Sequence, residues 1–144
     1  MKVFHSESYD QTLQIAEDFA KTLKKGAVIA YIGGLGMGKT AFTCGIAKGL
    51  GIDCDVTSPT FAICNTYIGE NAVLHHFDMY RVDSWDDLYS TGFFDYLDTD
   101  AYIAVEWSEN VYGALPDDAE IVEIIKTGDN SRDIKIYKKQ EVEQ

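Results

Sequence analysis

The sequence has little proline and little cysteine, and it contains no long hydrophobic run. Its most apolar stretch, residues 27–38, is far shorter than the ~20 residues that a membrane-spanning helix needs. The N-terminal residues turn polar at once and lack the apolar core of a secretion signal. We therefore expect a protein that has no membrane partner and stays in the cytoplasm.

The three cysteines, Cys44, Cys54 and Cys64, are odd in number and form no C-x-x-C pair. A structural zinc site requires close ligand pairs, and a disulfide framework requires more cysteines in a secreted chain. Buried, reduced thiols in a reducing compartment are the expectation. Because linkers, repeats and low-complexity stretches are also missing, the 144 residues are expected to form one domain, 1–144, without a separate substrate domain.

Basic residues are scarce in the middle of the chain. The whole sequence holds 12 Lys and Arg against 24 Asp and Glu, a net charge of −12. Residues 49–125 carry 16 of the acids and a single cation, Arg81, whereas the rest of the chain has a balance of +3. A surface this acidic repels phosphate backbones, which disfavours unaided nucleic-acid binding. The acidity favours either plain solubility or the docking of a basic partner protein.

Apolar periodicity and turn residues predict a mixed α/β fold. The first predicted helix is capped by Ser8, has Gln11 in a capping-box position and ends at Gly26. The other predicted elements are strands at 27–32, 61–68, 72–80, 101–107, 119–126 and 133–138, and helices at 39–50 and 84–90. A strand, loop and helix followed by hairpins predict a P-loop-type α/β domain, whose mixed sheet has a parallel centre, antiparallel hairpins and flanking helices.

The strongest motif follows the first predicted strand and matches the P-loop pattern G-x-x-x-x-G-K-S/T. Its glycines permit positive φ, so that consecutive N–H groups surround a phosphate. The next helix adds its positive dipole end, Lys39 meets the β- and γ-phosphates, and the Thr40 hydroxyl ligates Mg²⁺. A glycine-rich turn is the alternative. The predicted ATP-binding residues here are Gly33, Gly34, Leu35, Gly36, Met37, Gly38, Lys39, Thr40 and Ala41.

A second acidic group is expected near the magnesium, at the end of a neighbouring strand. Residues 103–105 are apolar and lead directly into Glu106. A buried carboxylate without a role would be costly, whereas beside Mg²⁺ its charge is compensated. We therefore assign Glu106 to metal binding and catalysis.

Residues 76–81 form a third cluster of polar side chains. Alternation along a strand puts His76, Asp78 and Tyr80 on one face. We assign Asp78 to catalysis, either near Mg²⁺ or as the group that orients an attacking water. Ordinary strand packing is the alternative for His76 and Tyr80, and Arg81 is suited to meet a carboxylate or a phosphate.

These motifs together resemble the TsaE (YjeE) family of bacterial P-loop ATPases. The resemblance rests on residues 33–40, 58–61, 76–81, 85–92 and 105–107, in matching order and spacing. It implies an ATPase that acts with the TsaD and TsaB proteins in threonylcarbamoyl modification of adenosine 37 in tRNAs reading codons that begin with A. It implies that tRNA is met only through that complex, and that ATP turnover drives or resets the complex.

The resemblance also implies roles for individual residues. Thr40 and Glu106 correspond to magnesium ligands, and Ser8, Thr12 and Arg132 to the surroundings of the nucleotide. The switch-like residues would be Ser58, Pro59, Thr60, Phe61, His76, Tyr80, Arg81 and Trp107, although sequence logic alone reads residues 58–61 as a turn. Gly34 departs from the family, because it replaces the acid usual at the second P-loop position.

Three other functions are weighed against this one. A small-molecule or nucleoside kinase shares the P-loop, but an arginine-bearing lid is not evident after the P-loop helix. A small GTPase would carry N-K-x-D and D-x-x-G sequences, which this chain lacks. A nucleotide sensor without turnover remains an alternative.

Overall fold

The computed structural model describes residues 1–33, 38–53 and 63–142. Seven strands in this part of the chain form one sheet, in the order β1-β7-β6-β2-β5-β4-β3. The strands are β1 (Lys2–Ser6), β2 (Val28–Ile32), β3 (Cys64–Ile68), β4 (Val73–Asp78), β5 (Tyr102–Glu106), β6 (Glu120–Lys126) and β7 (Arg132–Lys138). The helices are α1 (Tyr9–Ala20), α2 (Lys39–Gly49), α3 (Trp85–Ser90), α4 (Phe93–Leu97), the 3₁₀ segment η1 (Ser108–Ala114) and α5 (Lys139–Val142).

The centre of the sheet is parallel and its two sides are antiparallel. Strand β2 pairs in parallel with β5 and β6, and β5 pairs in parallel with β4. Antiparallel pairing adds β3 to β4 on one side, and β7 and then β1 to β6 on the other. The predicted mixed sheet is confirmed. Because β2, β4 and β5 are parallel, their carboxyl ends meet at one edge of the sheet.

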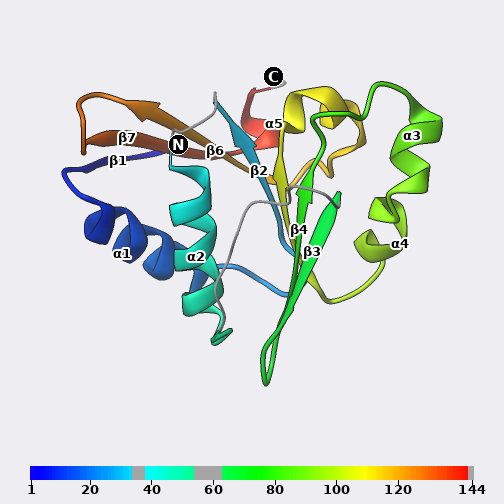
Figure 1. Cartoon of the computed structure of the whole chain (residues 1–144), viewed down its shortest axis with the longest axis horizontal. Coiled ribbons are helices and arrows are strands. Elements are labelled where there is room, and N and C mark those ends of the chain that lie inside the picture. Colours follow the sequence, from blue (N-terminus) through cyan, green and yellow to red (C-terminus); the bar gives the residue numbers. More distant parts are fainter. Residues whose placement is uncertain (34–37, 54–62, 143–144) are drawn as a thin grey trace.

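Helices cover both faces of this sheet (Figure 1), with α1 and α2 on one side and α3 and α4 on the other. Alternation along each strand divides the buried apolar residues between the two layers. Tyr31 and Ala104 pack in the cluster with α1 and α2, whereas Ala30 and Val105 pack in the cluster with α3, α4 and η1.

Helices α1 and α2 pack closely because α2 carries two glycines on the face toward α1. A Cβ atom at Gly45 would lie 2.5 Å from the Cβ of Ala16 and 2.6 Å from the carbonyl oxygen of Leu13. A Cβ at Gly49 would lie 2.5 Å from the carbonyl oxygen of Glu17. The close packing fixes α2, whose first residue is Lys39, against α1 and the sheet.

Two predicted helix starts are confirmed by their caps. Ser8 Oγ accepts a hydrogen bond of 3.1 Å from Gln11 N, and Ser84 Oγ accepts one of 3.1 Å from Asp87 N. In a capping box the Gln11 side chain would accept from the N–H of Ser8. Here it accepts instead from the N–H of Glu7, one residue earlier.

Other expectations need correction. Strand β1 was not predicted, and α1 ends at Ala20 rather than at Gly26, which has a φ of +80° and donates its N–H to Asp100 O just before β2. Strand β4 ends at Asp78, so Tyr80 lies in the following turn and not on a strand face. Helices α4 and α5 and segment η1 are additions to the predicted elements.

Candidate active site

Lys39 is the buried cation of the candidate site. It begins α2 directly after the loop that follows β2, and its side chain is only 4% exposed. Its ammonium group donates a 3.2 Å hydrogen bond to the carbonyl oxygen of Gly33. Gly33 and Gly38 have φ of +141° and +96°, values that favour glycine at both ends of the loop. A buried ammonium needs compensating polar groups, so this position suits a group that binds an anion.

Glu106 ends β5 and lies opposite Asp78, the last residue of β4. Its Oε2 atom is 2.8 Å from Nε2 of His76, and both side chains are buried. This close contact does not meet the geometry of a hydrogen bond. Among the described residues, Glu106 Oε2 and both ring nitrogens of His76 therefore lack a hydrogen-bond partner. Buried polar atoms of this kind are rare in folded proteins.

Asp78 is half-buried beside Glu106, and its carboxylate helps to form the turn that follows β4. Its Oδ1 atom accepts a 2.9 Å hydrogen bond from Tyr80 N. The side chain of Asn110, in η1, donates to the carbonyl oxygens of Met79 at 2.8 Å and Tyr80 at 3.2 Å. Asn110 therefore ties the turn after β4 to the segment after β5, a role that no sequence pattern indicated.

Trp107 connects the buried lysine to this turn. The Lys39 ammonium lies 5.6 Å from the centre of the Trp107 ring, within the range of a cation–π interaction. The same ring packs at 4.9 Å, centre to centre, on the exposed ring of Tyr80. The backbone of Trp107 is left-handed, with φ of 58° and ψ of 39°, which is the one positive φ at a non-glycine residue in the described ranges.

Buried hydroxyl groups hold the strands and helices around the site. Tyr31, in β2, has its phenol 2.7 Å from the hydroxyl of Thr43, which in turn donates to the carbonyl oxygen of Lys39. Burial raises the pKa of Tyr31 far above its ordinary value, which the Thr43 hydroxyl only partly opposes, so the phenol stays neutral. Ser108 Oγ donates to Tyr31 O at 2.7 Å and joins η1 to β2.

Arg132 lies beside Gly38, the residue that precedes α2. A Cβ at Gly38 would lie 3.8 Å from Arg132 Nε, a buried atom without a hydrogen-bond partner among the described residues. Ser6 pairs with Arg132 across β1 and β7, and its hydroxyl is 2.8 Å from that of the buried Thr12. The structure therefore brings Arg132 close to Gly38 and joins Thr12 to Ser6, whereas the hydroxyl of Ser8 caps α1.

The remaining predicted site residues divide into described and undescribed ones. Thr40 and Ala41 lie in the first turn of α2, and Arg81 is exposed in the turn after β4. Gly34, Leu35, Gly36 and Met37 lie outside the described residues, as do Ser58, Pro59, Thr60 and Phe61.

The donor set is suited to magnesium rather than to a softer metal. Thr40 and Glu106 offer oxygen atoms, and one of the Glu106 oxygens is buried without a hydrogen bond among the described residues. In the described ranges, His, Cys, Asp and Glu do not gather into a group of three or more that holds a metal. Mg²⁺ commonly uses one or two protein ligands and takes the rest from phosphates and water, so these residues fit it.

Comparisons with known proteins identify the family. Residues 6–134 match the family model described as threonylcarbamoyl adenosine biosynthesis protein TsaE. The chain is 36% identical over 129 residues to the TsaE protein of Haemophilus influenzae, covering 86% of this chain and 81% of that one. It is 37% identical over 135 residues to the TsaE protein of Aquifex aeolicus, covering 92% and 93%.

A solved structure is also similar to this fold. The crystal structure of YdiB from Bacillus subtilis superposes with a TM-score of 0.73 at 31% identity, covering 94% of this chain and 83% of that one. None of the described helices combines the length and apolar character that a membrane crossing requires. By its family match and by its relatives, the chain belongs to the TsaE family.

Proposed function

We propose that this protein binds and hydrolyses ATP as a component of threonylcarbamoyl adenosine biosynthesis. The family and its relatives, which are named tRNA threonylcarbamoyladenosine biosynthesis proteins, support the pathway. The observation that carries the ATP site is the buried Lys39 ammonium at the edge of the sheet where Glu106 and Asp78 end neighbouring strands. A cation and two acids at this edge suit a magnesium nucleotide.

In the proposed reaction, water attacks the γ-phosphate in line with the leaving ADP. The water oxygen bonds to phosphorus, the bond to the bridging oxygen breaks, and ADP leaves with that electron pair, while the proton of the water passes to an oxygen of the released phosphate. Lys39 stabilises the phosphate charge. Mg²⁺, held by Thr40 and Glu106, would neutralise charge on the β- and γ-phosphates. One oxygen of Asp78 accepts from Tyr80 N, and we assign the other to orienting the water.

We propose that the protein acts in the cytoplasm with the TsaD and TsaB proteins, and meets tRNA through their complex. The acidic balance of −12 supports an indirect role, because it disfavours direct binding of a phosphate backbone. We propose that turnover by the isolated chain is slow in the absence of these partners.

Two measurements test this function. Purified protein with ATP and Mg²⁺ should release phosphate and ADP, whereas a kinase would need a nucleoside or metabolite and would phosphorylate it. In cells depleted of the protein, nucleoside analysis of bulk tRNA should show loss of threonylcarbamoyladenosine, restored by the wild-type chain but not by Lys39→Ala. Unchanged tRNA in depleted cells would refute the pathway, and product analysis would separately refute the ATPase.

A further inference from the structure

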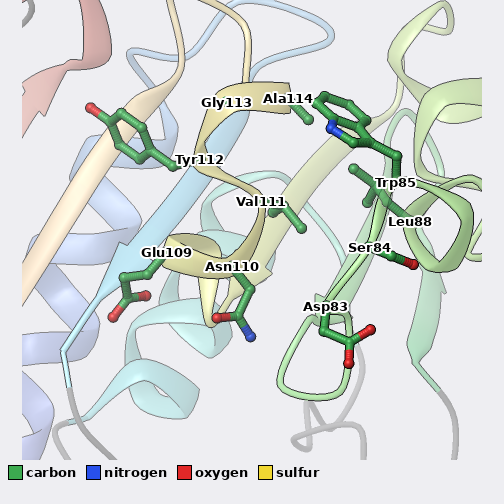
Figure 2. Close-up of a pocket in the computed structure, with 10 residues that line it drawn as sticks. All are labelled: Asp83, Ser84, Trp85, Leu88, Glu109, Asn110, Val111, Tyr112, Gly113 and Ala114. Carbon is green, nitrogen blue, oxygen red and sulfur yellow. The ribbon is translucent and has the colours of Figure 1, made fainter.

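A groove of about 230 Å³ lies between α3 and η1, on the face of the sheet away from α1 and α2. Figure 2 shows Leu88 of α3 and Val111 of η1 turned toward each other, with the indole of Trp85 across one end beside Ala114. Leu88 and Val111 are buried, whereas Trp85 is 59% exposed. We call this feature the α3–η1 groove; it has an apolar floor and an aromatic wall.

The aromatic wall continues onto the surface of α3 and α4. The ring of Phe94 is parallel to that of Trp85 within 16°, at 6.2 Å between centres, and lies 4.7 Å from that of Tyr89. Tyr89 is 64% exposed. Joined exposed aromatic side chains of this kind are a usual sign of a protein interface, whereas single exposed rings are ordinary.

The charge around the groove has one sign. Residues 83–114 contain eight acidic residues, and the sequence holds no Lys or Arg between Arg81 and Lys126. Asp83 and Glu109 line the groove itself. A hydrogen bond between the side chains of Asp83 and Asp87 raises the pKa of Asp83 and lowers that of Asp87, so the two carboxyl groups lie close together. A cation from a partner would be attracted to these acidic side chains.

We propose that the α3–η1 groove binds a segment of a partner protein in which an aliphatic side chain is flanked by Lys or Arg. The aliphatic side chain would enter between Leu88 and Val111, because a well-packed apolar pocket supplies most of the affinity of such a contact. One flanking cation would lie against the Trp85 ring, and the other would pair with Asp83. Nucleic acid is disfavoured here, since the same carboxylates repel its phosphates.

The groove begins where the candidate active site ends. Asn110 lines the groove and also donates to the carbonyl oxygens of Met79 and Tyr80. Tyr80 in turn packs on Trp107, the ring that lies beside the Lys39 ammonium. A segment bound in the groove would therefore contact the element that holds the turn next to the site. Binding itself requires neither nucleotide nor turnover.

The test is a titration of the isotope-labelled whole protein, followed by NMR, with a synthetic peptide that carries leucine between arginines. Two control peptides replace either the arginines with glutamate or the leucine with glycine. Trp85→Ala is the groove variant, and Tyr9→Ala is its matched control, because Tyr9 is also the first residue of a Ser-capped helix and is 60% exposed. A second pair tests the contribution of charge: Asp83→Asn is the groove variant, and Asp10→Asn is its control.

The proposal expects shifts at the Trp85 indole, Leu88, Val111 and Ala114 with the arginine–leucine peptide. Trp85→Ala should weaken binding by roughly tenfold or more, as truncation of an interface anchor does, while Tyr9→Ala leaves it unchanged. Any one of three results overturns the proposal: no shift at the groove, equally tight binding of a control peptide, or an equal loss of affinity in Trp85→Ala and Tyr9→Ala. Groove shifts that depend on protein concentration without peptide would also overturn it, since they assign the groove to a second copy of the chain.

Discussion

The imidazole of His76 lies 2.8 Å from the carboxylate of Glu106, and both side chains are buried where two neighbouring parallel strands end. The imidazole gives this carboxylate a polar neighbour at a place where burial alone would make its charge costly. The contact lies at the edge of the sheet that Lys39 also reaches.

Glu106→Gln should leave ATP binding nearly intact but slow hydrolysis, because the amide keeps the shape and removes the charge that holds Mg²⁺. We expect a fall of roughly 10²-fold, the scale seen when one group that stabilises a transition state is removed. Phosphate release at saturating ATP and Mg²⁺ measures it. Glu109→Gln, an exposed acid three residues further on, is the control. An unchanged rate would transfer the role to Asp78.

Lys39→Ala should weaken ATP binding by about 10- to 150-fold, since a charge-assisted contact contributes roughly 1.5–3 kcal/mol. Calorimetric titration measures the affinity. Lys48→Ala removes an exposed lysine near the other end of α2 and should bind ATP normally. Wild-type affinity in Lys39→Ala would refute the P-loop assignment.

Gly45→Ala should destabilise the fold, because the new methyl group would meet Ala16 Cβ at 2.5 Å and Leu13 O at 2.6 Å. Overpacking of this kind lowers the free energy of unfolding by roughly 1–3 kcal/mol. Gly113→Ala, where a Cβ meets nothing within 4 Å, is the matched control. Urea unfolding compares the two, and equal stability would mean that α1 shifts without penalty.

The histidine of β1 should make stability depend on pH. Hydrogen bonds to Asp133, and then to Glu7, raise the pKa of His5 above its ordinary value. The protonated ring is therefore favoured in the folded state, so its contribution is full below about pH 6.5 and is lost as the pH rises through the raised pKa.

His5→Gln isolates this contribution. The difference in unfolding free energy between wild type and variant should shrink as the pH rises from about 6 to about 9, and salt should reduce it because the groups are exposed. His75, whose pKa is lowered by burial, is common to both proteins and cancels. A difference that grows with pH would contradict the assignment.

Elements with strong local signals were predictable from the sequence, and context-dependent ones were not. Ser8 and Ser84 indicate where two helices begin, because an N-cap is a hydrogen bond between residues that are close in sequence. Strand β1 escaped prediction because it is an edge strand with mostly exposed side chains, held by pairing with the distant β7. Gly26 was misread because its positive φ serves the turn into β2, not the end of α1.

The candidate site was likewise predictable from the sequence only in part. Lys39 was predicted from the P-loop pattern, Asp78 from the polar cluster of residues 76–81, and Glu106 as the acid that follows an apolar strand. Parallel pairing of β4 with β5 then places Asp78 opposite Glu106. The contacts of Asn110 with Met79 and Tyr80 depend on a three-dimensional fold, because Asn110 is about thirty residues from both. The left-handed backbone at Trp107 likewise carries no sequence signal, since a glycine is the residue that would have indicated it.

The left-handed backbone of Trp107 sets backbone strain against side-chain packing at one residue. A non-glycine residue in this conformation costs about 1–3 kcal/mol, which glycine would recover. The Trp107 ring, however, packs against the core and contacts both the Lys39 ammonium and the Tyr80 ring, and truncation of a packed tryptophan costs roughly 3–5 kcal/mol. Directed evolution that selects for thermal tolerance alone would therefore keep the tryptophan together with its strained backbone.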